Sequence, residues 1–245
     1  MKWRFTPDEF IYVCSEFGAD RFPPPLRLLS SVRYRSEWET IEASCRARIP
    51  VRDDVDLLPV LRTIFEPQIT VEVVGRRESP IRAFGAVVTD IGVAVVQHPG
   101  ATDEYGGDVS IQVGSVNIVT RMVAAVAGST PAGTTSRMVE RLDRLRDRGP
   151  QDSWSTTPTR ESTRMRDLLA APRTGSGHVK ITHTSRSASR YVSWFDVRND
   201  GRYLYTRHGE EIHIDPCADH QFIDGLRRLV DGNRIQTTSA RSARN

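Results

Sequence analysis

The densest group of potentially reactive side chains in the sequence is the segment DPCADH at residues 215–220. A cysteine beside a histidine and a carboxylate is the residue set of nucleophilic hydrolases and transferases, in which the imidazole accepts the thiol proton. The same segment is typical of a helix start, because aspartate is a preferred N-cap and proline suits the first turn. A helix start accounts for more of the residues in this segment than a catalytic site does. The sequence therefore favours a structural role and keeps a small Cys217-dependent and histidine-dependent hydrolase or transferase as the alternative.

Histidines are the second group with chemical potential, and His178, His183, His208 and His213 all fall in strand-like sequence. Two metal ligands on one strand must lie an even number of residues apart, because successive side chains alternate between the faces. His178 and His183 do not meet this condition, whereas His208 and His213 flank a short hairpin and would approach each other across it. The Gly-rich segment 100–108 lacks the lysine and hydroxyl residue of a phosphate-binding loop. We therefore expect no metal site and no cofactor.

The composition is that of a globular protein, with 245 residues of which 38% are hydrophobic and 27% charged. The formal charge is +3, but three arginines follow the last acidic residue, Asp231, so the body is neutral and nucleic acid is not an expected partner. Cys14, Cys45 and Cys217 are far apart, as is usual for free thiols in a reducing compartment. No stretch has the apolar character of a signal peptide or a membrane span, which predicts a cytoplasmic protein without membrane insertion.

Helical and strand-like periodicities follow one another in a definite order. The first half is expected to hold helices at 7–17, from Ser36 onward and at 54–65, then four antiparallel strands between 69 and 113, and a helix at 115–127. The second half is expected to hold an amphipathic helix carrying Met138, a helix ending at Leu169, strands at 178–184, 190–197, 202–206 and 211–215, and a last helix at 216–230. Pro59 is expected to interrupt or kink the third helix.

The two halves match in position as well as in order. Ile69 and Val179, which open the first strand of each half, are 110 residues apart, and the turn glycines Gly92 and Gly201 are 109 residues apart. A repeat of this length indicates a duplicated half-domain rather than a short-period solenoid.

Open sheet edges are unfavourable, so the two halves are expected to join. We predict an α+β fold in which similar halves, at about 5–127 and 134–231, form one pseudo-two-fold central antiparallel sheet with flanking helices. This gives a single domain over 1–231. The segment 232–245 has no apolar periodicity and is expected to be a disordered tail.

Several sequence landmarks appear together in this duplicated pattern. The chain opens with FTPDEFIYVCSEFG, continues with PPPLRL, and closes with DGRYLY and EIHIDPCADHQFIDGLRRLV. The closing likeness is carried by Gly201, Arg202, Tyr203, Leu204, Pro216, Leu226 and Leu229. From about Phe5 to Val230 the chain resembles the EspG family, the cytosolic chaperones of actinobacterial type VII (ESX) secretion. The segment SEWETIEASCRARIPV departs from the second helix of that family.

The resemblance implies a non-enzymatic chaperone that binds the exposed helical tip of a PE–PPE heterodimer, or of a related helical substrate, and delivers it for secretion. Covering such a tip prevents its apolar residues from self-associating. The sequence leaves open which client is bound, which secretion locus is served and whether the chaperone forms a weak homodimer.

The expected client surface is centred on the strand RYVSWFDVR, because both of its faces carry apolar and polar residues. The turn that precedes this strand, the last helix and the first-half turn at 76–79 are expected to complete the surface. The expected contact residues are Arg76, Arg77, Glu78, Ser79, Arg186, Arg190, Ser193, Trp194, Phe222, Ile223 and Leu226.

Overall fold

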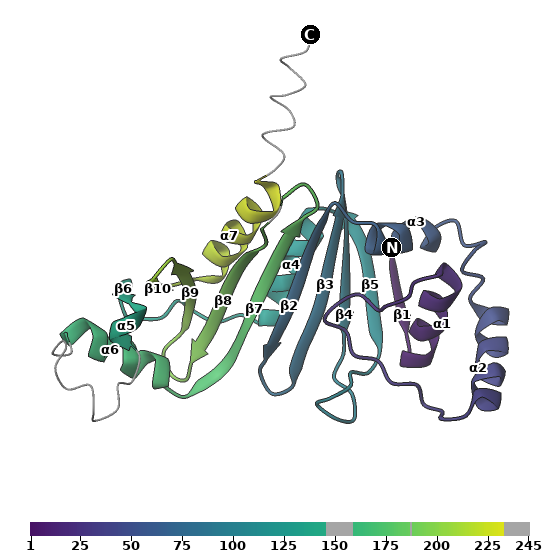
Figure 1. Ribbon diagram of the computed structural model, residues 1–245, viewed down its shortest axis with the longest axis horizontal. Coiled ribbons are helices and arrows are strands. Elements are labelled where there is room, and N and C mark those ends of the chain that lie inside the picture. The colour runs from purple at the N-terminus through teal and green to yellow at the C-terminus, as the bar shows by residue number, and fades with distance from the viewer. Residues whose placement is uncertain (146–158, 187, 233–245) are drawn as a thin grey trace, which may run out of the picture.

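A ten-stranded sheet runs through the molecule in the order β1-β5-β4-β3-β2-β7-β8-β9-β10-β6 (Figure 1). The computed structural model describes residues 1–145, 159–186 and 188–232, so the predicted tail lies almost entirely outside the described residues. The strands are β1 (Lys2–Phe5), β2 (Ile69–Arg76), β3 (Pro80–Val88), β4 (Ile91–Gln97), β5 (Val109–Ser115), β6 (Met138–Arg141), β7 (Arg173–His183), β8 (Arg190–Val197), β9 (Arg202–His208) and β10 (Glu211–Pro216). The helices are α1 (Pro7–Phe17), α2 (Arg35–Arg48), α3 (Leu57–Phe65), α4 (Asn117–Ala127), α5 (Leu142–Leu145), α6 (Arg160–Ala170) and α7 (Asp219–Asp231).

The sheet repeats itself about its centre. Strands β2 and β7 pair antiparallel, with Val73 opposite Val179, and three further strands of each half extend outward from them in chain order. The two outer edges of the sheet are alike as well, because a short strand completes each of them: β1 pairs with β5, and β6 pairs with β10. Each half then ends in a helix, α4 or α7. This antiparallel sheet with flanking helices agrees with the predicted α+β class.

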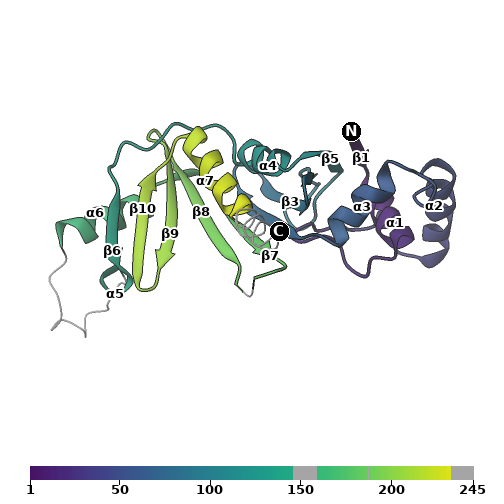
Figure 2. The same cartoon turned by 90° about the horizontal axis from the view of Figure 1, so that it is seen from above.

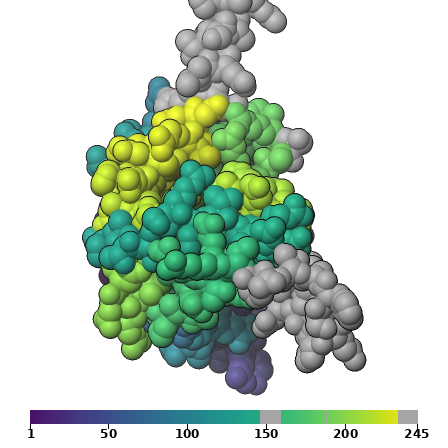
Figure 3. Space-filling model, turned by 90° about the vertical axis from the view of Figure 1, so that its left-hand side faces the viewer, coloured from purple at the N-terminus to yellow at the C-terminus, as the bar shows by residue number. Residues whose placement is uncertain are grey.

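Helices cover the two faces of the sheet unequally (Figures 1 and 2). Helices α4 and α7 lie on one face, where Trp194, Phe222 and Leu226 belong to the same buried cluster as the middle of the sheet. On the other face α1, α2 and α3 cover the β5 end, and α5 and α6 cover the β10 end. Figure 3 shows the β6 end of the molecule, with α7 in yellow along its upper side. The middle of the second face, over β2, β7 and β8, carries no helix in the described part of the chain.

Local capping explains where the first helices begin. Thr6 and Glu9 form a capping box on α1, since each side chain accepts a hydrogen bond from the backbone N–H of the other residue. At the start of α2 the backbone N–H of Tyr34 donates to the carboxylate of Glu37 at 3.3 Å, without a side-chain cap from Tyr34 itself. Pro59 lies in the first turn of α3, where its missing N–H costs no helical hydrogen bond, so the predicted interruption is wrong.

Two elements of the second half differ from the prediction. Met138 lies in β6, opposite Ile214 of β10, because a short edge strand satisfies the open side of β10. Asp215 and Pro216 end β10, and α7 starts at Asp219 after an Ala218 N-cap, so Asp215 is not the N-cap that the sequence suggested. Among the described residues, no helix is both long and apolar enough to cross a membrane.

Candidate partner-binding surface

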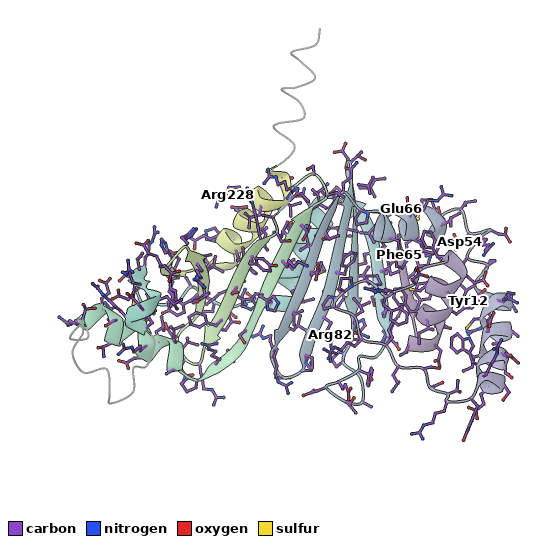
Figure 4. All side chains as sticks on the ribbon, viewed as in Figure 1. Tyr12, Asp54, Phe65, Glu66, Arg82 and Arg228 are labelled. Carbon is purple, nitrogen blue, oxygen red and sulfur yellow. The ribbon has the colours of Figure 1, made fainter. Side chains whose placement is uncertain are left out.

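The uncovered middle of the sheet presents a row of side chains that the strand registers place side by side. Arg82 of β3 lies opposite Val74 of β2, which lies opposite His178 of β7. His178 lies opposite Ser193 of β8, and Ser193 lies opposite Tyr205 of β9. Because neighbouring strands are about 4.8 Å apart, the row spans about 19 Å. Figure 4 shows Arg82 on this side of β3.

Residues two positions away on each strand extend this row along the sheet. We use the name open face for the resulting surface, which consists of Glu72, Val74, Arg76, Arg82, Ser176, His178, Lys180, Tyr191, Ser193 and Tyr205. These side chains are exposed or half-buried, and Tyr191 is 61% exposed. The open face is therefore a mixed surface with an aromatic and polar character, not a continuous apolar patch.

A shallow hollow of about 330 Å³ lies at the β8 side of the open face. It is lined by Leu169, Arg173, Ser176, Gly177, His178, Ser193, Trp194, Phe195 and Tyr205. The guanidinium of Arg173 lies 4.8 Å from the centre of the Phe195 ring, in a cation–π contact. The hollow offers apolar walls with polar groups at its rim, which suits a protruding side chain of another protein.

Two ion pairs organise the polar part of the open face. Lys180 donates to Glu72 at 2.8 Å, and this hydrogen bond raises the pKa of the Lys180 ammonium. Arg76 pairs with Asp103 at 2.6 Å and so connects β2 to the loop between β4 and β5. Arg82 donates to the backbone carbonyl of Glu104 in the same loop, at 3.2 Å. The loop is thus fixed against the edge of the open face.

The two turns that the sequence proposed for client contact lie at opposite ends of the sheet. Because β2 and β7 are antiparallel, Arg76 lies opposite Ser176 at one end, whereas Ile69 lies opposite His183 at the other. The distance between the ends is about 25 Å for strands of this length. The turn at 77–79 and the described residues between β7 and β8 (184–186 and 188–189) therefore do not form one surface.

At the first turn, Glu78 and the preceding Arg76 of β2 are exposed, and Ser79 is half-buried. Arg77 instead donates to the backbone carbonyl of Ala127 at 2.9 Å, at the end of α4. Arg77 therefore has a structural partner within the chain.

At the second turn, Arg190 is exposed, whereas Arg186 donates to the carbonyl of Gly232 at 2.9 Å. His183 contacts the carbonyl of Leu229 through Nε2 at 3.1 Å. These contacts attach the end of α7 to the turn between β7 and β8.

Three of the predicted contact residues belong to the core, and this part of the prediction is wrong. Trp194 is 1% exposed, Phe222 1% and Leu226 2%. The Trp194 and Phe222 rings lie 5.9 Å apart under α7. Gly177, opposite Trp194 in β7, leaves the space that the indole needs, because a Cβ there would lie 2.3 Å from the ring.

Ser193 and Ile223 are both accessible, but they belong to different faces of the sheet. Ser193 has the opposite parity to Trp194 and so lies on the open face. Ile223 is half-buried on α7, which packs on the other face. Of the predicted contact residues, Ser193 and Arg76 lie on the open face. Sequence reasoning missed His178, Lys180 and Tyr205, since only the strand registers bring them beside Ser193.

The alternative site at Cys217 lacks the properties of a nucleophile. The thiol is buried in the cluster under α7, on the other side of the sheet from the open face. Burial raises the pKa of Cys217 to about 11, so the reactive thiolate is scarce at neutral pH. The thiol donates a hydrogen bond to the carbonyl of the next residue, Ala218, at 3.5 Å.

We expect Cys217 of the native protein to resist alkylation by iodoacetamide at pH 7. With its pKa near 11, about one molecule in 10,000 carries the thiolate, and the burial excludes the reagent. Mass spectrometry after brief labelling of native and urea-unfolded protein measures this. Cys217→Ser is expected to remain folded and to bind its partner as the unmodified chain does. Equal labelling of Cys217 in both states, or loss of an enzymatic activity in the variant, contradicts a structural role.

Two of the histidine rings lie close together across a hairpin, as the sequence predicts. His208 and His213 approach across the β9–β10 hairpin with ring centres 4.7 Å apart. His213 also contacts Arg137 through Nδ1 at 3.1 Å and Glu211 through Nε2 at 3.3 Å. In the described parts of the chain, no three of the potential ligands His, Cys, Asp and Glu lie together as a metal site.

A buried arginine holds together the point where the two halves are joined. Arg202 is 1% exposed and forms two hydrogen bonds with the carboxylate of Asp196, at 2.7 and 3.0 Å. It also donates to the carbonyls of Ala127 and Gly128, at 2.9 and 2.8 Å, and to Asp219 at 3.3 Å. A single side chain thereby connects β8, the end of α4 and the start of α7.

Comparison with known proteins places this arrangement in a family. Residues 6–228 match the EspG family. The chain belongs to the EspG family. This confirms the resemblance of the opening helix and the closing strands to that family. Among curated proteins, none matches the sequence.

The EspG fold is also found in a solved structure, that of the type VII secretion system chaperone EspG5 from Mycobacterium tuberculosis in complex with the PE25–PPE41 dimer. The TM-score is 0.65 at 13% sequence identity, and the alignment covers 94% of this chain and 96% of EspG5. The likeness shows that the two chains share the fold over nearly their whole length.

The Gly-Arg-Tyr sequence that carried the EspG resemblance has a structural role here. Gly201 lies so close to the Ala132 carbonyl that a Cβ would be 2.5 Å from its oxygen. Arg202 forms the buried cluster with Asp196, and the Tyr203 hydroxyl accepts a hydrogen bond from the Thr135 backbone at 2.9 Å. The three residues hold the connection between the halves against β9, and none of them lies on the open face.

Proposed function

We propose that this EspG-family chain is a specific chaperone of a type VII secretion system, which binds the helical tip of a PE–PPE heterodimer in the cytoplasm and delivers the pair for export. The observation that carries the proposal is the family match over residues 6–228. The EspG5 chaperone, which has the same fold, was solved with a PE–PPE dimer bound, and this supports the same class of client.

The open face supports the proposal by its size and position. An α-helix with its side chains is about 10 Å wide, so a tip made of two packed helices needs a platform about 20 Å across. The row from Arg82 to Tyr205 spans five adjacent strands, about 19 Å by the usual strand spacing. Helices α1–α3 and α5–α6 border this platform on its two sides.

The character of the open face favours binding over catalysis. The hollow beside Ser193 has apolar walls formed by Phe195 and Leu169, which suits an apolar anchor from a client. The thiol of Cys217, the strongest candidate nucleophile in the sequence, lies in the core on the opposite side of the sheet. We infer a binding protein that makes no covalent bond with its client.

Co-purification tests the proposed function. The chain is co-expressed with each PE–PPE pair encoded in the same genome, and the mixtures are separated by size-exclusion chromatography. We expect at least one pair to elute together with the chaperone as a single complex, and the chaperone to increase the soluble yield of that pair. If every pair is well expressed and none binds, the proposal is wrong.

A further inference from the structure

The open face and its border carry more positive than negative side chains. Arg76 is neutralised by Asp103, and Lys180 by Glu72. Three further cations at this surface, Arg27, Arg82 and Arg173, form no ion pair with a carboxylate in the described part of the chain. The five cations outnumber the four carboxylates of this surface and its border, Glu72, Glu78, Asp103 and Glu104. The surface therefore has a small excess of positive charge, although the formal charge of the body is zero.

The three arginines lie at two separate places, one at the β3 end of the row of side chains that crosses the sheet and one beside the hollow at β8. Arg82 is at the β3 end, opposite Gln97 of β4. Gln97 binds the backbone of Arg27 with hydrogen bonds of 3.0 and 2.8 Å, which places Arg27 next to Arg82. Arg173 is at the hollow that also contacts His178. A molecule seated on the open face thus meets positive charge at two places.

The surroundings of Arg82 compensate its charge only in part, because Asp103 is shared with Arg76. Its hydrogen bonds go to the carbonyls of the 103–104 segment, which are neutral acceptors. Burial and, second, the neighbouring Arg27 lower the pKa of Arg82, whereas the nearby Asp103 carboxylate, which is already paired with Arg76, raises it. The guanidinium stays protonated at neutral pH. A partly desolvated cation beside another cation gains more from an incoming carboxylate than a fully hydrated one.

We infer that the client segment seated on the open face is acidic and places carboxylates against Arg27 and Arg82 at the β3 end of the row and against Arg173 beside the hollow. This rests on the proposed chaperone function and adds the chemistry by which the chaperone selects its client. A PE–PPE tip without these carboxylates leaves the arginines desolvated and unpaired, and it is rejected.

Calorimetric titration of the chaperone with the PE–PPE pair that it captures tests the inference. We expect the dissociation constant to rise at least tenfold between 50 and 500 mM NaCl, because salt screens charge pairs at a surface. Arg27→Glu is the cleanest variant, since the hydrogen bonds of Arg27 to Gln97 use only its backbone. It is expected to weaken binding at least tenfold, as is Arg173→Glu. The matched control is Arg121→Glu on α4, an exposed site on the other face, which is expected to bind within twofold of the unmodified chain.

A charge swap gives a second readout that a folding defect cannot imitate. Replacing an acidic residue at the client tip with lysine is expected to restore the binding of Arg27→Glu while weakening the binding of the unmodified chaperone. The inference is overturned if binding is insensitive to salt, or if Arg27→Glu and Arg173→Glu bind as tightly as Arg121→Glu does. Either result leaves the chaperone function intact. Failure of the unmodified chain to bind any pair at either salt concentration overturns the proposed function, and the inference with it.

Discussion

Arg202→Met is expected to destabilise the protein by about 3–5 kcal/mol, because it leaves the Asp196 carboxylate buried without a partner. The carbonyls of Ala127 and Gly128 also lose their donor. For a chain of this length the change corresponds to a fall of about 10 °C or more in the melting temperature. Thermal and urea unfolding followed by circular dichroism measure both quantities.

Arg207→Met is the matched control for this experiment. Arg207 lies on the same strand, but its pair with Glu210 is exposed, so the expected loss is at most about 0.5 kcal/mol. Combining Arg202→Met with Asp196→Asn removes both charges and is expected to recover part of the lost stability. Equal melting temperatures for Arg202→Met and Arg207→Met show that the buried cluster does not hold the halves together.

Ser193→Glu is expected to weaken client binding at least 100-fold, about 2.7 kcal/mol, with little change in the melting temperature. Ser193 is half-buried at the centre of the open face, where a bound tip excludes water and a new carboxylate opposes the inferred acidic client. Titration with the captured PE–PPE pair measures the affinity, and circular dichroism checks the fold.

Two further variants separate an interface effect from a folding effect. Ala125→Glu places the same charge on an exposed position of α4, on the other face, and is expected to bind normally. Trp194→Glu, one residue from Ser193, is expected to unfold the protein, because the indole is part of the core under α7. If Ser193→Glu binds as tightly as Ala125→Glu, the client occupies another surface.

Sequence periodicity predicted most of the elements because each buries one side against the same sheet. The helix at 7–17 and the strand at 190–197 agree with the structure to the residue. Met138 was misplaced because β6 has only four residues, too few to show alternation. Pro216 was misplaced because a proline at the end of an edge-proximal strand looks the same in sequence as one in a first helical turn.

The candidate site was harder to predict than the fold, for a geometric reason. Periodicity shows that a strand has two faces, but not which of them a helix of the same chain will cover. Trp194 and Ser193 are neighbours in sequence, yet one is core and the other surface. The assembly of the open face depends on the register between β2 and β7, which are separated by about a hundred residues, and local sequence carries no signal of that register.

The antiparallel seam between β2 and β7 has the geometry of an isologous dimer interface, in which the same edge of two identical subunits meets itself across a two-fold axis. In a homodimer of half-length chains, any change on one side of the axis would appear on the other side as well. A single chain is free of that constraint. One half borders the platform with α1–α3 and the other with α5–α6, so a two-fold scaffold presents a one-sided surface, as recognition of an asymmetric partner requires.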